Sequence, residues 1–334
     1  MTKLSRRALL AGSSALLAAP AILSLTGRAY AATTLTLGHG AAPGNPRTLA
    51  AEEFARLVAE KTDGRLTVNI AGAETLGNDA AMLTSLQTGA IDFTANSQGP
   101  SSALVPEMAV LGLPFLFSDA DAAFAVVDGP IGETLAKKFE AIGIIPLGYW
   151  DNGIRHVSNS KRAINAPADL AGLKIRTPAD PMTIDIFTAL GSSTEQIAFG
   201  ELYVALQQGV VDGQENPLAN ISSSKLYEVN KFISLTAHKW ESTPFLMSKA
   251  AEAKVGADMD AVRAAAVEAG TMQRTLSKQA AVDTLTSFQS NADIAVNEVD
   301  RPAFVAATAG EADAWKPKPD VGPFVEELLA AAKA

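Results

Sequence analysis

The sequence predicts an α/β protein with two similarly built domains, each a mainly parallel sheet flanked by helices. Segments with strand-like and helix-like patterns alternate along the chain, and this order gives parallel sheets covered by helices. The alternation occurs twice, and residues 86–92 and 206–212 share the pattern LQxGxxD. Ligands of open α/β sheets bind beside the carboxyl ends of the strands, so we expect a site in a cleft between the domains.

The first half follows a strand, helix, strand, helix, strand order. Leu49, Phe54 and Leu57 recur at helical spacing after a loop rich in glycine and proline, and Gly64 provides a stop signal. The expected strands are residues 34–37, 66–70 and 90–94, and the expected helices are residues 47–62 and 78–88.

The second half repeats this order. Asp180 and Pro181 are a typical N-cap and first helical residue. The alanine-rich stretch 250–290 has no proline and predicts a long helix that could run across both domains. The expected strands are residues 172–176 and 193–197, a helix covers residues 200–208, and residues 210–212 lead into the next strand.

Residues 1–31 have the order of a secretory signal peptide. Arg6 and Arg7 precede an alanine- and leucine-rich run, and a small-residue cleavage site ends at Ala31. Paired arginines in this place are typical of the twin-arginine export route. The alternative, an N-terminal membrane anchor, is opposed by Gly12 and Pro20, which interrupt the apolar run. We therefore expect a protein exported to the periplasm.

Composition excludes several classes of function. The chain carries a formal net charge of -9, and loss of the four cationic residues of the signal would leave -13, so we expect no nucleic-acid partner. No cysteine is present, which excludes disulfides, thiolate metal sites, iron–sulfur clusters and cysteine nucleophiles. No later stretch is long and apolar enough to span a bilayer.

The motifs of common enzymes are missing. The three histidines are not paired at metal-ligand spacing, and the sequence contains no HExxH, GxSxG or GxxxxGK[ST] motif. The glycine-rich turn around His39 lies between a predicted strand and helix, but Pro43 stands where a dinucleotide fingerprint needs its third glycine. We expect no catalysis, cofactor or metal; an exported hydrolase or cofactor enzyme is the alternative.

Two arginines lie where a cleft is expected. Arg155 follows the turn at residues 151–153, and Arg176 ends a predicted strand. A guanidinium grips a carboxylate through two parallel hydrogen bonds, a geometry that lysine cannot copy. In a chain this acidic, an anionic ligand needs local positive charge. Spacing alone leaves open that both arginines instead form ion pairs with acids of the surface.

Several ordered blocks of the chain resemble the DctP-like solute-binding proteins of TRAP transporters (tripartite ATP-independent periplasmic transporters). The similarity extends from about residue 34 to at least residue 247. The blocks that carry it are residues 111–115, 153–155, 168–176, 198–203 and 206–217.

This resemblance implies a periplasmic binding protein fold that closes around its ligand by a hinge motion, with crossing strands and a long helix joining the domains. It implies domain 1 at residues 32–154 plus about 243–280, and domain 2 at residues 155–242 plus about 281–334. The expected partners are a small carboxylate and the membrane subunits of a TRAP transporter, and we expect a monomer.

The resemblance also implies roles for individual residues. Arg176 looks like the family's carboxylate clamp and Arg155 like its frequent second cationic contact. Asn216 looks like the polar residue that helps to fix that carboxylate, and Phe199 like an apolar wall of the cleft.

The class of ligand is inferred from polar residues of the first domain. Sialic-acid binders of the family carry a glutamate shortly after the strand near residue 93, where this chain has Asn96-Ser97-Gln98. A hydroxylated ligand fits the hydrogen-bonding groups of the first domain, so we expect a sugar acid such as a hexuronate. Alternatives are a C4-dicarboxylate, an aromatic or a keto acid, and a sensory rather than a transport role. The expected contacts of the first domain are His39, Asn45, Glu74, Asn96 and Gln98.

Overall fold

A nine-stranded sheet runs through residues 32–333, the part of the chain that this computed structural model describes. The predicted signal peptide lies outside these residues. The strands are β1 (Thr33–His39), β2 (Leu66–Ala71), β3 (Phe93–Ala95), β4 (Ile144–Asn159), β5 (Lys174–Thr177), β6 (Ser193–Gln196), β7 (Gly213–Pro217), β8 (Phe232–Ser248) and β9 (Ala295–Asn297).

The order of the strands is β2-β1-β3-β8-β4-β7-β5-β6, with β9 paired to β8. At one end β1 pairs in parallel with β2 and β3, and at the other β5 pairs in parallel with β6 and β7. The predicted α/β class is therefore confirmed. The two predicted parallel sheets are continuous, because the antiparallel strands β4 and β8 connect them. At ~3.3 Å per residue these strands are long enough to belong to both.

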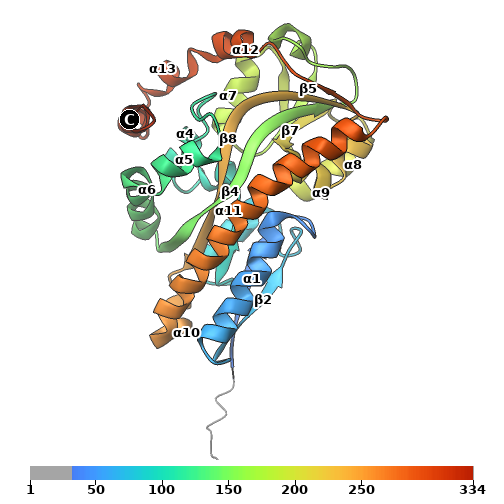
Figure 1. Cartoon of the computed structure of the whole chain (residues 1–334). Helices are drawn as coiled ribbons and strands as arrows, with labels where there is room; N and C mark the ends of the chain where they lie inside the picture. Colours follow the sequence, from blue (N-terminus) through green and yellow to red (C-terminus); the bar gives the residue numbers. More distant parts are fainter. Residues whose placement is uncertain (1–31, 334) are drawn as a thin grey trace, which may run out of the picture. The chain divides into compact units, whose positions relative to one another are not determined.

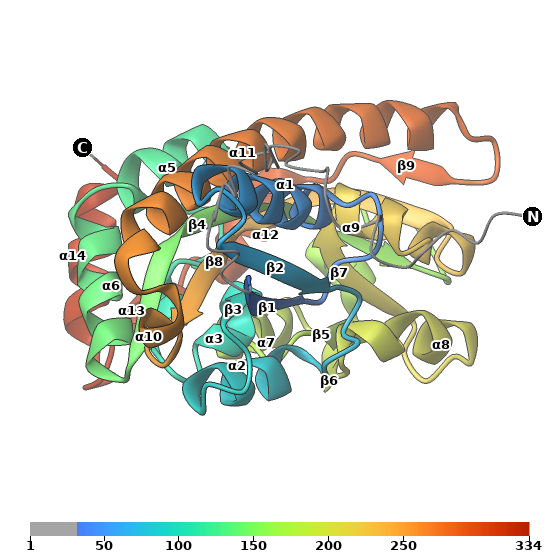
Figure 2. The same cartoon turned by 90° about the horizontal axis from the view of Figure 1, so that it is seen from below.

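Helices cover the sheet (Figures 1 and 2). The α-helices are α1 (Pro46–Lys61), α2 (Asp79–Gln87), α3 (Gln98–Ser101), α4 (Glu107–Val110), α5 (Ala120–Val127), α6 (Pro130–Ala141), α7 (Pro181–Ala189), α8 (Leu202–Gln207), α9 (Leu218–Ser223), α10 (Ala251–Val255), α11 (Met259–Ser290), α12 (Arg301–Thr308), α13 (Glu311–Trp315) and α14 (Gly322–Ala331). The 3₁₀ helices are η1 (Pro167–Leu170), η2 (Phe199–Glu201), η3 (Leu226–Glu228) and η4 (Gly256–Asp258).

The start of α7 follows the predicted capping chemistry, and α1 starts in the same way, at Asn45, which was predicted as a ligand contact. The Asn45 side chain accepts a hydrogen bond of 2.9 Å from the Arg47 N–H at the start of α1. The Asp180 side chain accepts one of 3.1 Å from the Met182 N–H at the start of α7. Each cap satisfies a backbone donor that the helix itself leaves unpaired. Because a proline occupies the first turn of both helices, the position and the direction of each helix are fixed by local sequence.

The predicted long helix is interrupted once. Gly256 adopts a φ of +57°, so α10 ends there and α11 begins three residues later. The 32 residues of α11 extend ~48 Å at 1.5 Å per residue. The helix contacts α1, β4 and α9 along its length (Figure 1). It therefore connects elements of the first and the second half of the chain.

The LQxGxxD repeat has the same structure in both halves. Gly89 and Gly209 follow α2 and α8 with φ values of +74° and +72°. Asp92 then accepts a bond of 2.8 Å from the N–H of Thr36, and Asp212 one of 2.9 Å from that of Lys174. Asp92 therefore connects the segment after α2 to β1, and Asp212 connects the segment after α8 to β5. The strand predicted at 90–94 starts later, at β3, and residues 210–212 lead into β7, because these aspartates occupy the bend before each strand.

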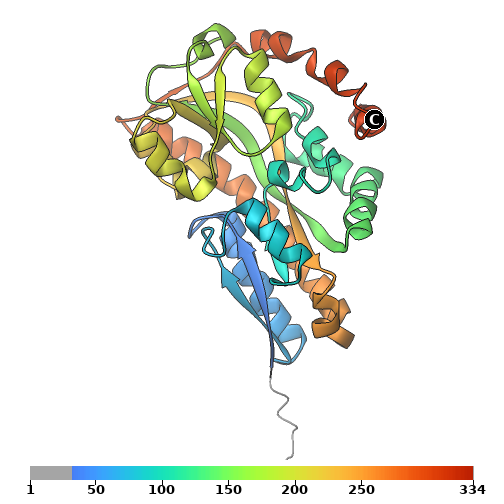
Figure 3. The same cartoon turned by 180° about the vertical axis from the view of Figure 1, so that it is seen from behind.

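The apolar side chains gather into three clusters. One lies between α1, α11 and the β1–β3 side of the sheet, where the Trp150 and Phe245 rings stack at 4.6 Å. A second surrounds α8, α9 and β9. The third includes Phe304 and Phe324 of the C-terminal helices, which lie beside α4, α6 and α7 (Figure 3).

Candidate functional site

A cavity of about 190 Å³ lies at the carboxyl ends of the parallel strands. Its wall includes residues that follow β1, β2 and β3 on one side and residues that follow β5 and β6 on the other. This is the position that the α/β fold predicts for a ligand. The volume is below the roughly 300 to 1,000 Å³ of pockets that enclose drug-sized molecules, so it suits a small metabolite.

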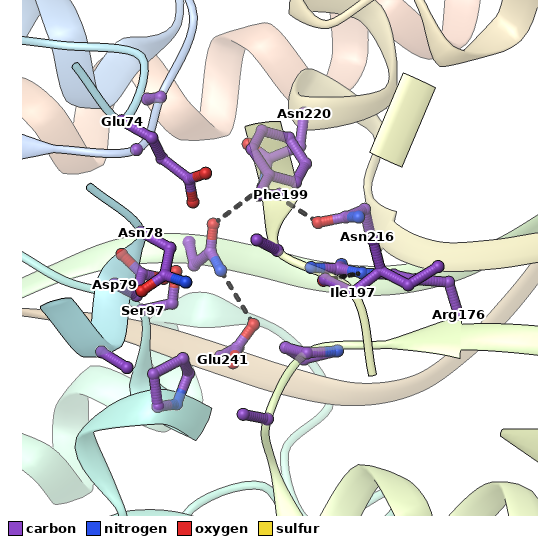
Figure 4. Close-up of a pocket in the computed structure, with 18 of the residues that line it drawn as sticks. Glu74, Asn78, Asp79, Ser97, Arg176, Ile197, Phe199, Asn216, Asn220 and Glu241 are labelled. Carbon is purple, nitrogen blue, oxygen red and sulfur yellow. Dashed lines mark hydrogen bonds between the residues drawn. The ribbon is translucent and has the colours of Figure 1, made fainter. Parts of the chain in front are cut away.

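Arg176 contributes a buried cation to this cavity (Figure 4). The side chain is 3% exposed, and its Nε donates to the Ile197 carbonyl oxygen at 2.9 Å. Its guanidinium lies over the Phe199 ring, 5.9 Å from the centroid. Burial lowers the pKa of Arg176 to about 10. Within residues 32–333 it has no carboxylate within 4 Å, so the two terminal nitrogens remain available for an anion.

Asn216 lies on β7, beside the strand that carries Arg176. Its amide nitrogen donates to Gln214, and its oxygen accepts a bond of 3.2 Å from Asn220. Asn220 also donates to Asn152 at 3.1 Å. These bonds fix the orientation of the amide next to the guanidinium, so that its second N–H is positioned for a ligand.

Arg155 also reaches the cavity wall, but its charge is compensated by the protein. It forms ion pairs with Glu215 and Glu241, and its Nη2 donates to the Glu215 backbone oxygen at 2.6 Å. Burial opposes the charge, but the two carboxylates outweigh it and raise the pKa of Arg155. All three side chains are at most 2% exposed. The two predicted arginines therefore differ: Arg155 has protein partners, whereas Arg176 has none of opposite charge.

A third arginine on the wall, Arg47, was missed by the sequence analysis. It is 6% exposed, and its Nη2 donates to Thr243 at 2.8 Å and to Asn152 at 3.2 Å. Burial lowers its pKa. The available signal was its place in the first turn of α1, where the helix dipole favours acidic residues and this helix has none.

Two carboxylates face the cavity from the first half of the chain. Asp79, at the start of α2, is 9% exposed, and its Oδ1 has no hydrogen-bond partner within the described residues. Glu74 follows β2 at a φ of +58° and accepts a bond of 2.8 Å from the Gly200 N–H on the opposite side. Burial raises the pKa of both carboxyl groups. The cavity is thus polarised, with acids on one side and Arg176 on the other (Figure 4).

The structure places the nine predicted site residues in two groups. Five lie on the cavity wall, namely Arg155, Arg176, Asn216, Phe199 and Glu74. The other four, His39, Asn45, Asn96 and Gln98, lie outside it.

Three of these four residues hold residues of the wall, and Gln98 holds a sequence neighbour of one. Asn45 caps α1 and donates to Asn220 at 2.9 Å, and Asn96 donates to the backbone oxygen of Asp79 at 3.0 Å. Gln98 accepts a bond of 2.9 Å from the N–H of Ser242. His39 is fully buried and accepts from the Ala41 N–H at 3.2 Å. All four side chains therefore bond to other residues of the protein and do not line the cavity.

Between residues 32 and 333, histidine, aspartate and glutamate side chains form no group of three with the arrangement of a metal site. No helix in this range combines the length and the apolar character that a membrane span requires.

Residues 37–316 match the family model described as bacterial extracellular solute-binding protein, family 7, or DctP. The chain belongs to this family. It is a family of extracellular solute-binding proteins, not of enzymes. The match includes every element that forms the cavity wall.

Known relatives agree with this family 7 assignment. An uncharacterized protein of Sinorhizobium fredii is 68% identical over 307 residues, which cover 92% of this chain but 57% of that protein. The sugar acid binding protein DctPAm of Advenella mimigardefordensis, solved with galactonate, is 34% identical with a TM-score of 0.87, over 90% of this chain and 98% of that one. A TRAP solute-binding protein of Sulfurospirillum deleyianum, solved with succinate, is 30% identical with a TM-score of 0.84, over 91% and 99%.

Proposed function

We propose that this protein binds a sugar acid in the periplasm and delivers it to the membrane subunits of a TRAP transporter. The observation that carries the proposal is Arg176, a buried guanidinium that lines the cavity and has no carboxylate partner among the described residues. Burial of an unpaired charge is costly, and an anionic ligand removes that cost. A family 7 binding protein would use this charge to hold the ligand carboxylate.

The expected interaction is a pair of parallel hydrogen bonds from the guanidinium to the carboxylate, with Asn216 beside it. Charge-assisted bonds of this kind contribute about 1.5 to 3 kcal/mol each. The Nε bond to Ile197 supports this role, because it orients the side chain before the ligand arrives. Arg155 and Phe199 line the same region, the first as a weaker cationic contact and the second as an apolar wall.

Hydroxyl groups on the ligand are supported by the opposite side of the cavity. Asp79, Glu74 and Asn78 offer oxygen acceptors there. The relative solved with galactonate supports a sugar acid, and a hexuronate is our narrower expectation. The relative solved with succinate supports the second candidate, a C4-dicarboxylate. An aromatic or keto acid without hydroxyl groups would leave these acceptors without donors.

We also propose how the signal segment and the two domains take part in transport. Residues 1–31 would direct export, through the twin-arginine route, and would then be removed at Ala31. Domain 1 (residues 32–154 and about 243–280) and domain 2 (residues 155–242 and about 281–334) would close on the ligand as a monomer. The bond from Gly200 to Glu74, which joins the two sides of the cavity, supports such a closure.

The test is binding by an Arg176→Ala variant. We expect galactonate and galacturonate to raise the melting temperature of the unaltered protein and to leave that of the variant unchanged. Calorimetry should show an affinity loss of roughly 100-fold or more, from two charge-assisted bonds. Arg56→Ala is the matched control, because Arg56 is an exposed arginine whose side chain is 56% accessible. The proposal would be contradicted if the Arg176 variant bound these ligands with the same affinity as the unaltered protein.

A further inference from the structure

We propose that the carboxylates of Asp79 and Glu74 make this cavity select hydroxylated monocarboxylates against dicarboxylates of the same carbon skeleton. The inference rests on the proposed function and extends it from the carboxylate end of the ligand to the opposite end. It concerns the acidic side of the cavity, defined by these two residues and Gly40.

Asp79 has a side-chain oxygen that requires a hydrogen-bond donor from the ligand. Its side chain lines the cavity, is 9% exposed, and carries an Oδ1 without a partner within the described residues. The backbone of Asp79 is fixed, since α2 begins there and its carbonyl accepts a bond of 3.0 Å from Asn96. A buried acceptor without a donor costs free energy. A ligand hydroxyl donates a hydrogen bond to it, whereas an ionised ligand carboxylate cannot.

Glu74 enlarges the same acidic surface. Its Oε2 is held by the Gly200 N–H at 2.8 Å. A Cβ atom built on Gly40 would lie 3.5 Å from Oε1 of Glu74 and 3.7 Å from Oδ1 of Asp79. Both oxygens therefore border one space, which the absent side chain of Gly40 leaves open. A group of the ligand in that space meets two carboxylate oxygens together.

The positive charges of the cavity offset this arrangement only in part: Arg47 favours ionised Asp79, but burial dominates and raises the pKa of that carboxyl group. Arg176 lies on the other side and would hold the first carboxylate (Figure 4). Arg155 is paired with two glutamates. Arg47 already donates through Nη2 to Thr243 and Asn152, and Asp79 is the charged neighbour that favours its ionisation most. A second ligand carboxylate beside Gly40 meets like charge at short range and low polarity when Asp79 or Glu74 is ionised, and repulsion is strong there.

The test uses ligands that differ in one group. Galactonate and galactarate have the same carbon skeleton, but the terminal CH₂OH of the first is a carboxylate in the second; gluconate and glucarate form a second such pair. By calorimetry on the unaltered protein we expect each monocarboxylate to bind at least roughly tenfold more tightly than its dicarboxylate partner. Asp79→Asn should reduce this ratio at least roughly tenfold, mainly by improving dicarboxylate binding.

Glu74→Gln should reduce the ratio in the same direction, and it keeps the test valid if the Asp79 variant does not fold. Asp121→Asn is the matched control, because Asp121 is 74% exposed and lies outside the cavity wall; its ratio should equal that of the unaltered protein. The inference is overturned if the unaltered protein binds the dicarboxylates as well as the monocarboxylates, or if both cavity variants keep its ratio. Failure of the proposed function gives other results: no sugar acid binds the unaltered protein, or Arg176→Ala leaves the binding of every acid unchanged.

Discussion

At the scale of single residues, the two predicted arginines illustrate how environment decides a role. Arg155 and Arg176 are both buried at the cavity wall. Arg155 lies within β4, and Arg176 lies near the end of β5. Only the first is enclosed by carboxylates of the chain. A buried ion pair that loses one member leaves an uncompensated charge, whereas a buried cation without a charged partner leaves no charge behind when it is removed.

Arg155→Met should therefore lower the free energy of unfolding by about 3 to 5 kcal/mol, because Glu215 and Glu241 lose their partner. Arg176→Met should lower it by less than about 1 kcal/mol or raise it. Urea unfolding without ligand measures both. A larger loss for the Arg176 variant than for the Arg155 variant would contradict this distinction.

Sequence alone could place Arg176 at the cleft, since it stands near a strand end before a proline, but its spacing did not distinguish a ligand contact from an ion pair with a surface acid. It could not tell that Arg155 is neutralised, because Glu215 and Glu241 lie 60 and 86 residues away along the chain. Arg47 was missed for a similar reason. Its contact with Thr243 joins positions that only the folded sheet brings together.

At the scale of elements, local signals predicted the parallel strands and their helices, and long-range pairing decided the rest. Strand β8 shows little alternation, because polar residues such as Lys239 are buried on it and paired with Asp180. Strand β4 contains Pro146, Gly148 and Gly153, and its register with β8 shifts near them. For these reasons the local patterns did not predict the two strands, and only the family resemblance implied strands that cross between the domains.

The two glycines of the LQxGxxD repeat provide a matched test. Both have positive φ, but a Cβ on Gly209 would meet nothing within 4 Å, whereas one on Gly89 would lie 2.7 Å from the Cβ of Ala250. Gly209→Ala should cost about 1 to 2 kcal/mol of unfolding free energy, from backbone conformation alone. Gly89→Ala should cost more, because the clash adds to it. Equal losses of unfolding free energy for the two variants, measured by urea unfolding, would contradict a clash between residue 89 and Ala250.

At the scale of the whole molecule, the pH dependence of the unfolding free energy tests whether His39 is buried in its neutral form. Burial, with repulsion by Arg47, lowers the pKa of His39 to about 4 from the ordinary 6.5. The unfolded chain then binds more protons than the folded one between these values. The stabilisation by neutral His39 is therefore complete above about pH 6.5 and is lost as the pH falls toward about 4.

Between about pH 7 and about pH 5, the unaltered protein should lose about 2 kcal/mol more unfolding free energy than a His39→Gln variant. Both proteins share every other titrating group, so the difference isolates His39. Urea titrations at the two pH values measure it. Parallel losses in the two proteins would show that His39 is protonated in the folded state.

The central claim is that Arg176 holds the carboxylate of the ligand. A crystal structure of the protein grown with galactonate tests this most directly. We expect both carboxylate oxygens about 2.7 to 2.9 Å from the guanidinium nitrogens of Arg176, with the hydroxyl groups directed toward Asp79. A ligand bound with its carboxylate away from Arg176, or with that side chain directed into solvent, would contradict the account.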